Sequence, residues 1–265
     1  MLLSSVILVL QETLEAALLV SVLLTISYQL WNRIAWLLIG IGGGLVLSYL
    51  YAGYMVEVSE WFDYVGQEIV NASLQVLTTF FIVVCTWAAY KSQRRGSVAR
   101  QTQTNPFASV FVFCAAAAVA LAITREGSEI LLYLGGFLQQ QEYFRTVMVG
   151  SSIGFSIGFS IGILLYYGLS SLPVRWRLDA AVILMALFAG NMLAQAVLQL
   201  TQADWIPSTR AFWDTSQGLP ENSFLGQLLY ALVGYEATPS AAQLIAYAAG
   251  VILILVFRAV GKYSK

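Results

Sequence analysis

Histidine is absent from the sequence, cysteine occurs only twice, and charged residues make up only 10% of the 265 positions. The lack of histidine speaks against a Cys/His metal site. The two cysteines, Cys85 and Cys114, both lie in apolar stretches, where neither a disulfide framework nor a thiolate cluster is expected. So few charges, together with 59% apolar residues and a mean hydropathy of +0.76, exclude an ordinary soluble domain. The composition therefore predicts a membrane protein.

Long apolar runs predict an all-α integral membrane protein with seven transmembrane helices. A helix needs about 20 apolar residues to cross the hydrocarbon layer, and each run meets that length. The first run lacks a basic start and continues past Glu15, so we expect a retained span rather than a signal peptide. The expected spans are residues 1–30, 34–56, 69–90, 107–138, 146–172, 178–200 and 241–260.

Charge is distributed unevenly between the connections, and this predicts the orientation. Basic residues gather on one set of connections, which the positive-inside rule places in the cytoplasm. Acidic residues gather on the other set, so we expect the N-terminus outside and the C-terminus cytoplasmic in a multi-pass protein of the plasma (inner) membrane. The basic set is Arg33, Lys91, Arg94, Arg95, Arg100, Arg175, Arg177, Arg258, Lys262 and Lys265, and the acidic set is Glu57, Glu60, Asp63, Glu68, Asp204, Asp214, Glu221 and Glu236.

Two short acidic motifs lie within these apolar runs. They are Gln11-Glu12-Thr13-Leu14-Glu15 in the first span and Arg125-Glu126-Gly127-Ser128-Glu129 in the fourth. An ionised carboxylate inside a membrane is costly unless it is paired, hydrated or bound to a cation. One such motif could serve helix capping or an ion pair, but two at matching depth favour cation passage.

The spacing of the motifs indicates an inverted repeat. They lie 114 positions apart (125 minus 11), and three spans separate their helices, so the second copy has the opposite orientation. We expect one polytopic domain, residues 1–265, built from repeats 1–90 and 107–203. A cytoplasmic basic loop (91–106), an external segment (204–240) and the seventh span with its tail (241–265) complete it. Binding sites in such proteins usually lie at the midplane between the repeats.

Helix geometry places the two carboxylates of each motif on one face, because residues i and i+3 are neighbours. Counting roughly 1.5 Å per residue gives an outer layer of Glu12 and Glu129 about 15 Å deep, with Glu15 and Glu126 about a turn further in. These hard oxygen ligands suit Mg²⁺, Ca²⁺, Mn²⁺ or iron. Arg125 is expected to act either as a counter-charge in the empty site or as a gate that moves when metal enters.

The motifs resemble those of the high-affinity iron permeases, the oxidase-dependent iron transporters of fungi and the elemental iron uptake permeases of bacteria. The stretches that carry the resemblance are Arg125–Glu129, Gln11–Glu15 and a late run from Asp214 to Ser240 that includes Gly234-Tyr235-Glu236-Ala237-Thr238-Pro239-Ser240. The resemblance implies iron import, with Glu12, Glu15, Glu126 and Glu129 as ligands of the ion. It also implies iron(II) or iron(III) as transported substrate and an external oxidase or iron-delivery protein as partner. Gln11 departs from the arginine usual there, leaving one positive charge fewer.

Other polar residues have two interpretations each. Asn191, Gln195 and Gln199 form an i, i+4, i+8 stripe on the sixth span, which fits either a pathway lining or hydrogen-bonded helix packing. Glycines at every fourth position of the fifth span, Gly150 to Gly162, predict close helix packing. Glu68 and the other acids after the second span fit either cation capture or a solvated loop. Asp214 lies in the late stretch that resembles the iron permeases, which makes it a candidate for a pathway or charge-tuning residue.

The sequence contains no phosphate-binding loop of the G-x-x-x-x-G-K-[ST] form, so we expect an ion gradient, the membrane potential or a partner to supply the energy. The alternatives are a Mn²⁺ or Ca²⁺/proton exchanger using the same carboxylates, and an intramembrane metal-dependent hydrolase. The hydrolase is poorly supported, because Thr13 and Ser128 are the only hydroxyls near the motifs. We expect a transporter rather than an enzyme, with the bilayer as partner and no organic cofactor or nucleic acid.

Overall fold

The computed structural model describes residues 1–31, 34–95, 106–138, 140–220 and 223–263. Of the charged residues discussed above, Arg33, Arg100, Glu221 and Lys265 lie outside these ranges. The described chain is helical throughout, apart from connections and one isolated bridge between Ala211 and Ser240. Its helices are α1 (Leu2–Trp31), α2 (Ala35–Gly53), α3 (Met55–Ser59), α4 (Trp61–Tyr64), α5 (Gly66–Arg95), α6 (Pro106–Gly135), α7 (Gln141–Ser171), α8 (Val174–Gln202), α9 (Phe224–Val233) and α10 (Ala241–Tyr263).

Seven helices of the described chain are long and apolar enough to cross a membrane: α1, α2, α5, α6, α7, α8 and α10. This confirms the seven expected spans. Several helices extend beyond the apolar runs that predicted them, since α5 continues to Arg95 and α8 begins at Val174. Helical hydrogen bonding satisfies the backbone without water, which is why a chain this apolar is helical through the bilayer.

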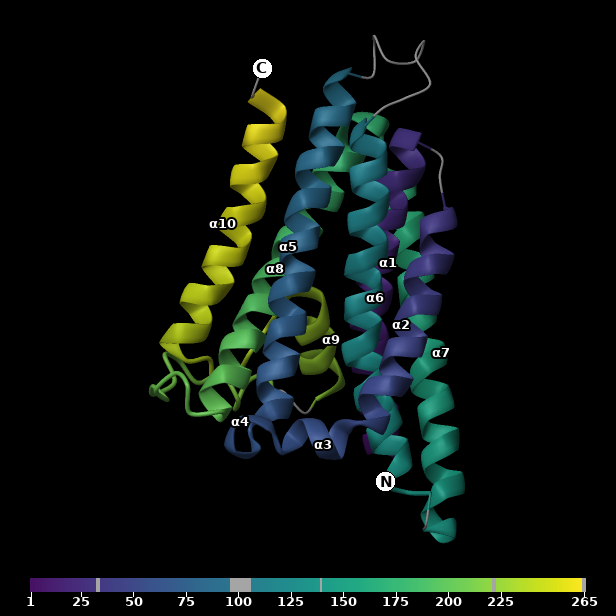
Figure 1. Cartoon of the computed structure of the whole chain (residues 1–265), viewed down its shortest axis with the longest axis vertical. Coiled ribbons are helices and arrows are strands. Elements are labelled where there is room, and N and C mark those ends of the chain that lie inside the picture. Colours follow the sequence, from purple (N-terminus) through teal and green to yellow (C-terminus); the bar gives the residue numbers. More distant parts are fainter. Residues whose placement is uncertain (32–33, 96–105, 139, 221–222, 264–265) are drawn as a thin grey trace.

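The long helices run side by side, so that α1 begins and α10 ends at opposite ends of the bundle (Figure 1). The short helices α3 and α4 lie across the end at which α1 begins, and α9 lies within that half of the bundle. Lys91, Arg175 and Lys262 therefore lie towards one end of the bundle. Glu57 in α3 and Glu60, the C-cap of α3, lie at the other end.

Glycines and other small residues bring two helix pairs into close contact. On α7, a Cβ added to Gly158 would lie 2.9 Å from the Cβ of Thr13, and one added to Gly162 would lie 2.7 Å from the Cβ of Ala17, so α7 packs directly on α1. This agrees with the packing role expected for that glycine series. A second seam joins α2 to α6, where a Cβ on Gly44 would lie 2.7 Å from the Cβ of Ile123.

A large apolar core lies on one side of the acidic motifs. Its α1 members run from Leu18 to Ile26, beyond Glu15, and its α6 members run from Phe111 to Ala122, before Arg125. Both sets therefore lie between the motifs and the end of the bundle at which α1 ends.

Candidate metal site between α1 and α6

The two motifs meet where α1 packs beside α6. Glu12 and Glu15 come from α1, and Glu126 and Glu129 come from α6. Glu15 is fully buried, and Glu126 and Glu12 are 2% and 6% exposed. The Glu129 side chain is 30% exposed, which makes it the most accessible carboxylate of the four.

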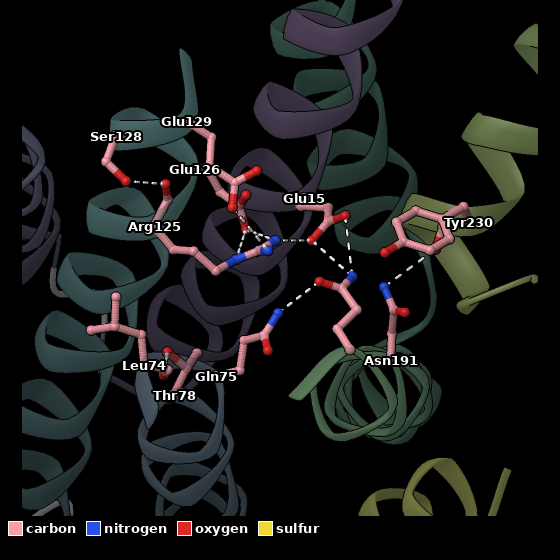
Figure 2. A network of polar contacts seen from close by, with 11 residues as sticks. Glu15, Leu74, Gln75, Thr78, Arg125, Glu126, Ser128, Glu129, Asn191 and Tyr230 are labelled. Carbon is pink, nitrogen blue, oxygen red and sulfur yellow. Dashed lines mark hydrogen bonds and ion pairs between the residues drawn. The ribbon is translucent and has the colours of Figure 1, made fainter. Parts of the chain in front are cut away.

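The guanidinium group of Arg125 lies among these carboxylates (Figure 2). Its Nη2 donates to Oε2 of Glu15 at 2.9 Å and to Oε1 of Glu126 at 2.5 Å. Its Nη1 lies 3.5 Å from Oε1 of Glu129, at the outer limit for a hydrogen bond. One buried cation thus joins three of the four predicted ligands, two from α6 itself and one from α1.

Glu12 completes the cluster from the side of α1. Its carboxylate interacts electrostatically with Glu129 and Glu126, and more weakly with Arg125. Glu12 lies one turn before Glu15 on the same face of α1.

Two carboxylate oxygens of the cluster are buried without a hydrogen-bond partner in the described chain: Oε2 of Glu12 and Oε2 of Glu126. A buried acceptor without a partner costs about 1–3 kcal/mol, so these atoms are suited to receive a ligand. Within the described ranges, no three Asp, Glu, Cys or His side chains yet surround one point at metal-binding distance. The Arg125 guanidinium lies between the carboxylates of Glu15 and Glu126.

Amide side chains continue the network toward α5 and α8. Nε2 of Gln195 lies 3.4 Å from Oε1 of Glu15, and Oε1 of Gln195 accepts from Nε2 of Gln75 at 2.8 Å (Figure 2). Gln195 is therefore part of the site. Asn191, by contrast, donates to the backbone oxygen of Tyr230 at 3.3 Å and so serves packing of α9 on α8.

Sequence reasoning missed Gln75, although a signal was present. Asn71, Gln75 and Thr79 repeat at i, i+4 and i+8 on α5, the same pattern that singled out Asn191 on α8. All three are at most 2% exposed, and both Oε1 of Gln75 and Oγ1 of Thr79 lack hydrogen-bond partners in the described chain. The polar stripe on α5 thus faces inward.

The helix α9 was also not predicted. Oγ of Ser223 accepts from the backbone N–H of Gly226 and caps its start, and Gly234 ends it at a left-handed φ of 70°. The apolar run between these two residues could have indicated it. Burial, with a further contribution from Glu15, raises the pKa of Tyr230 well above its ordinary value, so this phenol stays neutral beside the carboxylates.

Glu68 lies on the outer side of the cluster. It belongs to the first turn of α5 and is half-buried. The Tyr51 hydroxyl of α2 donates to Oδ1 of Asn71, which lies one turn after Glu68 on α5, at 3.0 Å.

Asp214 and Gln11 are not part of the charged network. Asp214 lies in an exposed turn, where the hydroxyl and backbone N–H of Ser216 donate to Oδ1 and lower the pKa of its carboxyl. Gln11 is half-buried and precedes Glu12 on α1.

Seven membrane-length helices around a buried cluster of carboxylates define a polytopic membrane protein with a charged site in its interior. The model of the Iron permease FTR1 family matches residues 2–263, so the chain belongs to that family. Comparison with curated proteins and with solved structures gives no match. Membership confirms the resemblance read from the motifs and gives the general function: a multi-pass membrane permease for iron, a transporter by family rather than an enzyme.

Proposed function

We propose that the chain imports iron by passing the ion through the cluster of Glu12, Glu15, Glu126 and Glu129. The observation that carries this proposal is the convergence of three of these residues, Glu15, Glu126 and Glu129, from two distant motifs, on a single buried cation, the Arg125 guanidinium. A site that holds a guanidinium between carboxylates already has the ligand type and charge that a hard metal cation requires.

Arg125 acts in this proposal as the counter-charge that an arriving ion replaces. Four ionised glutamates and one arginine give the cluster a formal charge of −3 (−4 plus 1). An iron(II) or iron(III) ion brings enough positive charge to take over the pairing of Glu15 and Glu126. The guanidinium then has to withdraw, since a second cation at the same point would be repelled. This combines the two roles considered for Arg125, because the counter-charge must move for metal to bind.

The approach to the site is proposed to follow Glu68, Tyr51, Asn71 and Glu129. Glu68 at the start of the path is half-buried and Glu126 at its end is buried, so an ion that follows the path loses contact with water before it reaches the inner carboxylates. The apolar core on the opposite side of the cluster supports a conformation that is closed there. Release on that side requires the core to open.

The orientation of the protein is proposed from its charges. Lys91, Arg175, Arg177 and Lys262 belong to the end of the bundle that we assign to the cytoplasm, by the positive-inside rule. The N-terminus and the approach at Glu68 are then external, which makes transport through the plasma (inner) membrane an import. A membrane potential of about 100 mV, negative inside, favours this direction by roughly 2.3 kcal/mol per elementary charge.

Helix packing supports the proposed inverted repeat. If α1, α2 and α5 correspond to α6, α7 and α8, then the closely packed pair α1 and α7 corresponds to the closely packed pair α6 and α2. Both pairs are joined by glycine seams. In this arrangement the acidic motifs of α1 and α6 are equivalent, and the ion lies between the two repeats.

Two other functions use the same carboxylates. A Mn²⁺ or Ca²⁺/proton exchanger would need the same ligand set, and family membership favours iron over it. A hydrolase would need an available nucleophile beside the metal. The Ser128 hydroxyl instead donates to the backbone oxygen of Arg125 at 2.7 Å, which leaves Thr13 as the remaining hydroxyl.

Uptake into vesicles tests the proposal. The purified chain is placed in liposomes with an inside-negative potential, and entry of iron(II) and iron(III) is measured with and without excess Mn²⁺ or Ca²⁺. We expect potential-dependent iron entry that Glu126→Gln abolishes and Glu57→Gln retains, because Glu57 is an exposed acid outside the cluster. Calcium entry coupled to proton exit, with no iron entry, would instead identify an exchanger. An external oxidase that sets the oxidation state of the ion is a further proposed partner, and adding one should matter only if iron(III) is the species that enters.

A further inference from the structure

A stripe of buried polar residues runs along α5 past the level of the carboxylate cluster. Its members follow one another at intervals of four, four, seven and four residues, which places them on one face of the helix. All are at most 4% exposed, and they are Asn71, Gln75, Thr79, Thr86 and Tyr90. Polar side chains inside a membrane are costly, so a stripe of this length marks either a hydrogen-bonded helix contact or a pathway.

The stripe faces α8, which it contacts at three levels. The contacts are Nε2 of Gln75 to Oε1 of Gln195 at 2.8 Å, Oγ1 of Thr86 to Sδ of Met185 at 3.7 Å, and the Tyr90 hydroxyl to Oδ1 of Asp179 at 2.5 Å. The seam between α5 and α8 therefore carries polar contacts from the level of the carboxylates to the end of the bundle at which α5 ends.

Two oxygens of the stripe are buried without a hydrogen-bond partner in the described part of the chain: Oε1 of Gln75 and Oγ1 of Thr79. Gln75 is 1% exposed and Thr79 is 2% exposed. The amide nitrogen of Gln75 is directed at Gln195, while its oxygen lies on the other side of the amide (Figure 2). Because residues i and i+4 are neighbours on a helix, the two side chains lie one above the other. Hydrogen-bonded packing of α5 on α8 explains the amide nitrogen but neither of the two oxygens.

These two oxygens lie between the carboxylate cluster and the apolar core. Gln75 is joined to Glu15 through Gln195, whose Nε2 lies 3.4 Å and 3.5 Å from the two oxygens of Glu15. Thr79 is one turn further along α5, about 6 Å, and the buried α5 members of the core begin at Ile82. An ion that leaves Glu15 along this seam therefore meets the two oxygens before it meets the core.

We infer that Oε1 of Gln75 and Oγ1 of Thr79 form a second, uncharged site for the iron ion, which receives the ion from Glu15 before its release between α5 and α8. The inference rests on the proposed import through the carboxylates. Oxygen ligands suit hard cations, but amide and hydroxyl oxygens carry no negative charge, so they hold the ion less tightly than glutamates do. A conducted ion must be bound weakly enough to leave, and an uncharged site next to the carboxylates meets that requirement.

Thr79→Val tests the inference, because it replaces the hydroxyl by a methyl group of similar size. The hydroxyl has no partner to lose in the described chain, so the variant should melt at the wild-type temperature or slightly above it. Uptake of iron(II) into liposomes, under reducing conditions and an inside-negative potential, should fall about tenfold, since one contact to a buried ion is lost. Equilibrium binding of iron(II) to the purified protein should be unchanged, because the carboxylates are intact. Thr79→Ser keeps the hydroxyl and should retain uptake.

The matched control is Thr78→Val, the same change at the preceding position. Thr78 is also 1% exposed, but its hydroxyl donates to the backbone oxygen of Leu74 at 2.8 Å and is not available to an ion. We expect this variant to take up iron like the wild type. Equal uptake by Thr78→Val and Thr79→Val would overturn the inference. A loss of iron(II) affinity in Thr79→Val as large as its loss of uptake would also overturn it, because Thr79 would then belong to the carboxylate site.

Glu126→Gln, measured alongside, separates this inference from the proposed function. If Glu126→Gln abolishes uptake while Thr79→Val imports iron normally, the path through the carboxylates stands and only the uncharged site is wrong. If Glu126→Gln imports iron normally, the carboxylate path is wrong and the uncharged site falls with it.

Discussion

Nη2 of Arg125 lies 2.9 Å from Oε2 of Glu15, a residue 110 positions earlier in the chain. Both side chains are at most 7% exposed, so this ion pair is formed out of contact with bulk water. Removing one partner of such a pair leaves a buried charge uncompensated, at a cost of about 3–5 kcal/mol, unless another ion replaces it. The charge balance of the site therefore depends on which cation lies beside Glu15, the Arg125 guanidinium or a metal ion.

Replacing any one of Glu12, Glu15, Glu126 or Glu129 by glutamine should lower the rate of iron uptake by at least about tenfold. Glutamine keeps the size of the side chain but removes a charged ligand. The protein should still insert and fold, because the cluster has three more negative than positive charges and tolerates the loss of one. Uptake and membrane insertion are measured on the same preparations. Normal uptake by all four variants would contradict the assignment, and Glu60→Gln should have only a mild effect.

Arg125→Gln should make the stability of the protein strongly dependent on metal. Without the guanidinium, the four carboxylates lack a buried counter-charge, so the metal-free protein should melt at a lower temperature than the wild type. Added iron(II) should raise the melting temperature of the variant more than that of the wild type, since it need not displace an ion pair. Melting curves with and without iron(II), under reducing conditions, measure both effects. Equal increments in the two proteins would show that Arg125 does not occupy the place of the ion.

Gln11→Arg restores the positive charge that the family motif usually has, and we expect it to weaken metal binding. At an effective dielectric constant near 20, a unit charge about 6 Å away repels a divalent ion by several kcal/mol. The order of metal preference should be kept, because the ligands are unchanged, and the metal-free site should take up fewer protons. Metal affinity measured over a range of pH tests this. Equal or tighter binding by the variant would show that position 11 points away from the carboxylates.

The seam between α1 and α7 should be sensitive to a single methyl group. A Cβ on Gly154 would overlap the backbone oxygen of Val6, whereas a Cβ on Gly168 of the same helix would meet nothing within 4 Å. Gly154→Ala should destabilise the protein by about 1–3 kcal/mol through overpacking. Gly168→Ala should be neutral or stabilising by about 0.5–1 kcal/mol, because alanine favours helix more than glycine does. Thermal unfolding in detergent compares the two, and equal effects would argue against close contact at this seam.

The orientation is tested by labelling single cysteines with an impermeant thiol reagent on intact cells. The background is Cys85→Ala/Cys114→Ala, which removes two buried thiols. Cysteine at Ser208, an exposed residue between α8 and α9, should react, and cysteine at Ser171, exposed at the end of α7, should be protected. The reverse pattern would place the N-terminus in the cytoplasm and turn the proposed import into export.

The spans and the position of each acidic motif within a span could be predicted from the sequence because each depends on a local pattern. An apolar run of membrane length has few alternatives to a helix, and the i, i+3 spacing of Glu12 and Glu15 fixes their common face. The helices α3, α4 and α9 were missed because they are short and depend on packing, as the positive φ angles of Phe62 and Asp63 in α4 illustrate. The direction of the Arg125 side chain could not be predicted either, since it depends on where α1 lies relative to α6.

The two glycine seams also limit how the protein can move. Where glycine and other small residues bring two helix backbones together, a sliding movement would collide with the neighbouring side chains, so α1 with α7 and α2 with α6 should each behave as a rigid rod. One rod carries Glu12 and Glu15, and the other carries Arg125, Glu126 and Glu129. Any opening that frees an ion from both motifs has to separate the rods. In the proposed transport, the Arg125–Glu15 ion pair would form again when no iron is bound, so that the empty protein could return without exposing an unpaired charge to lipid.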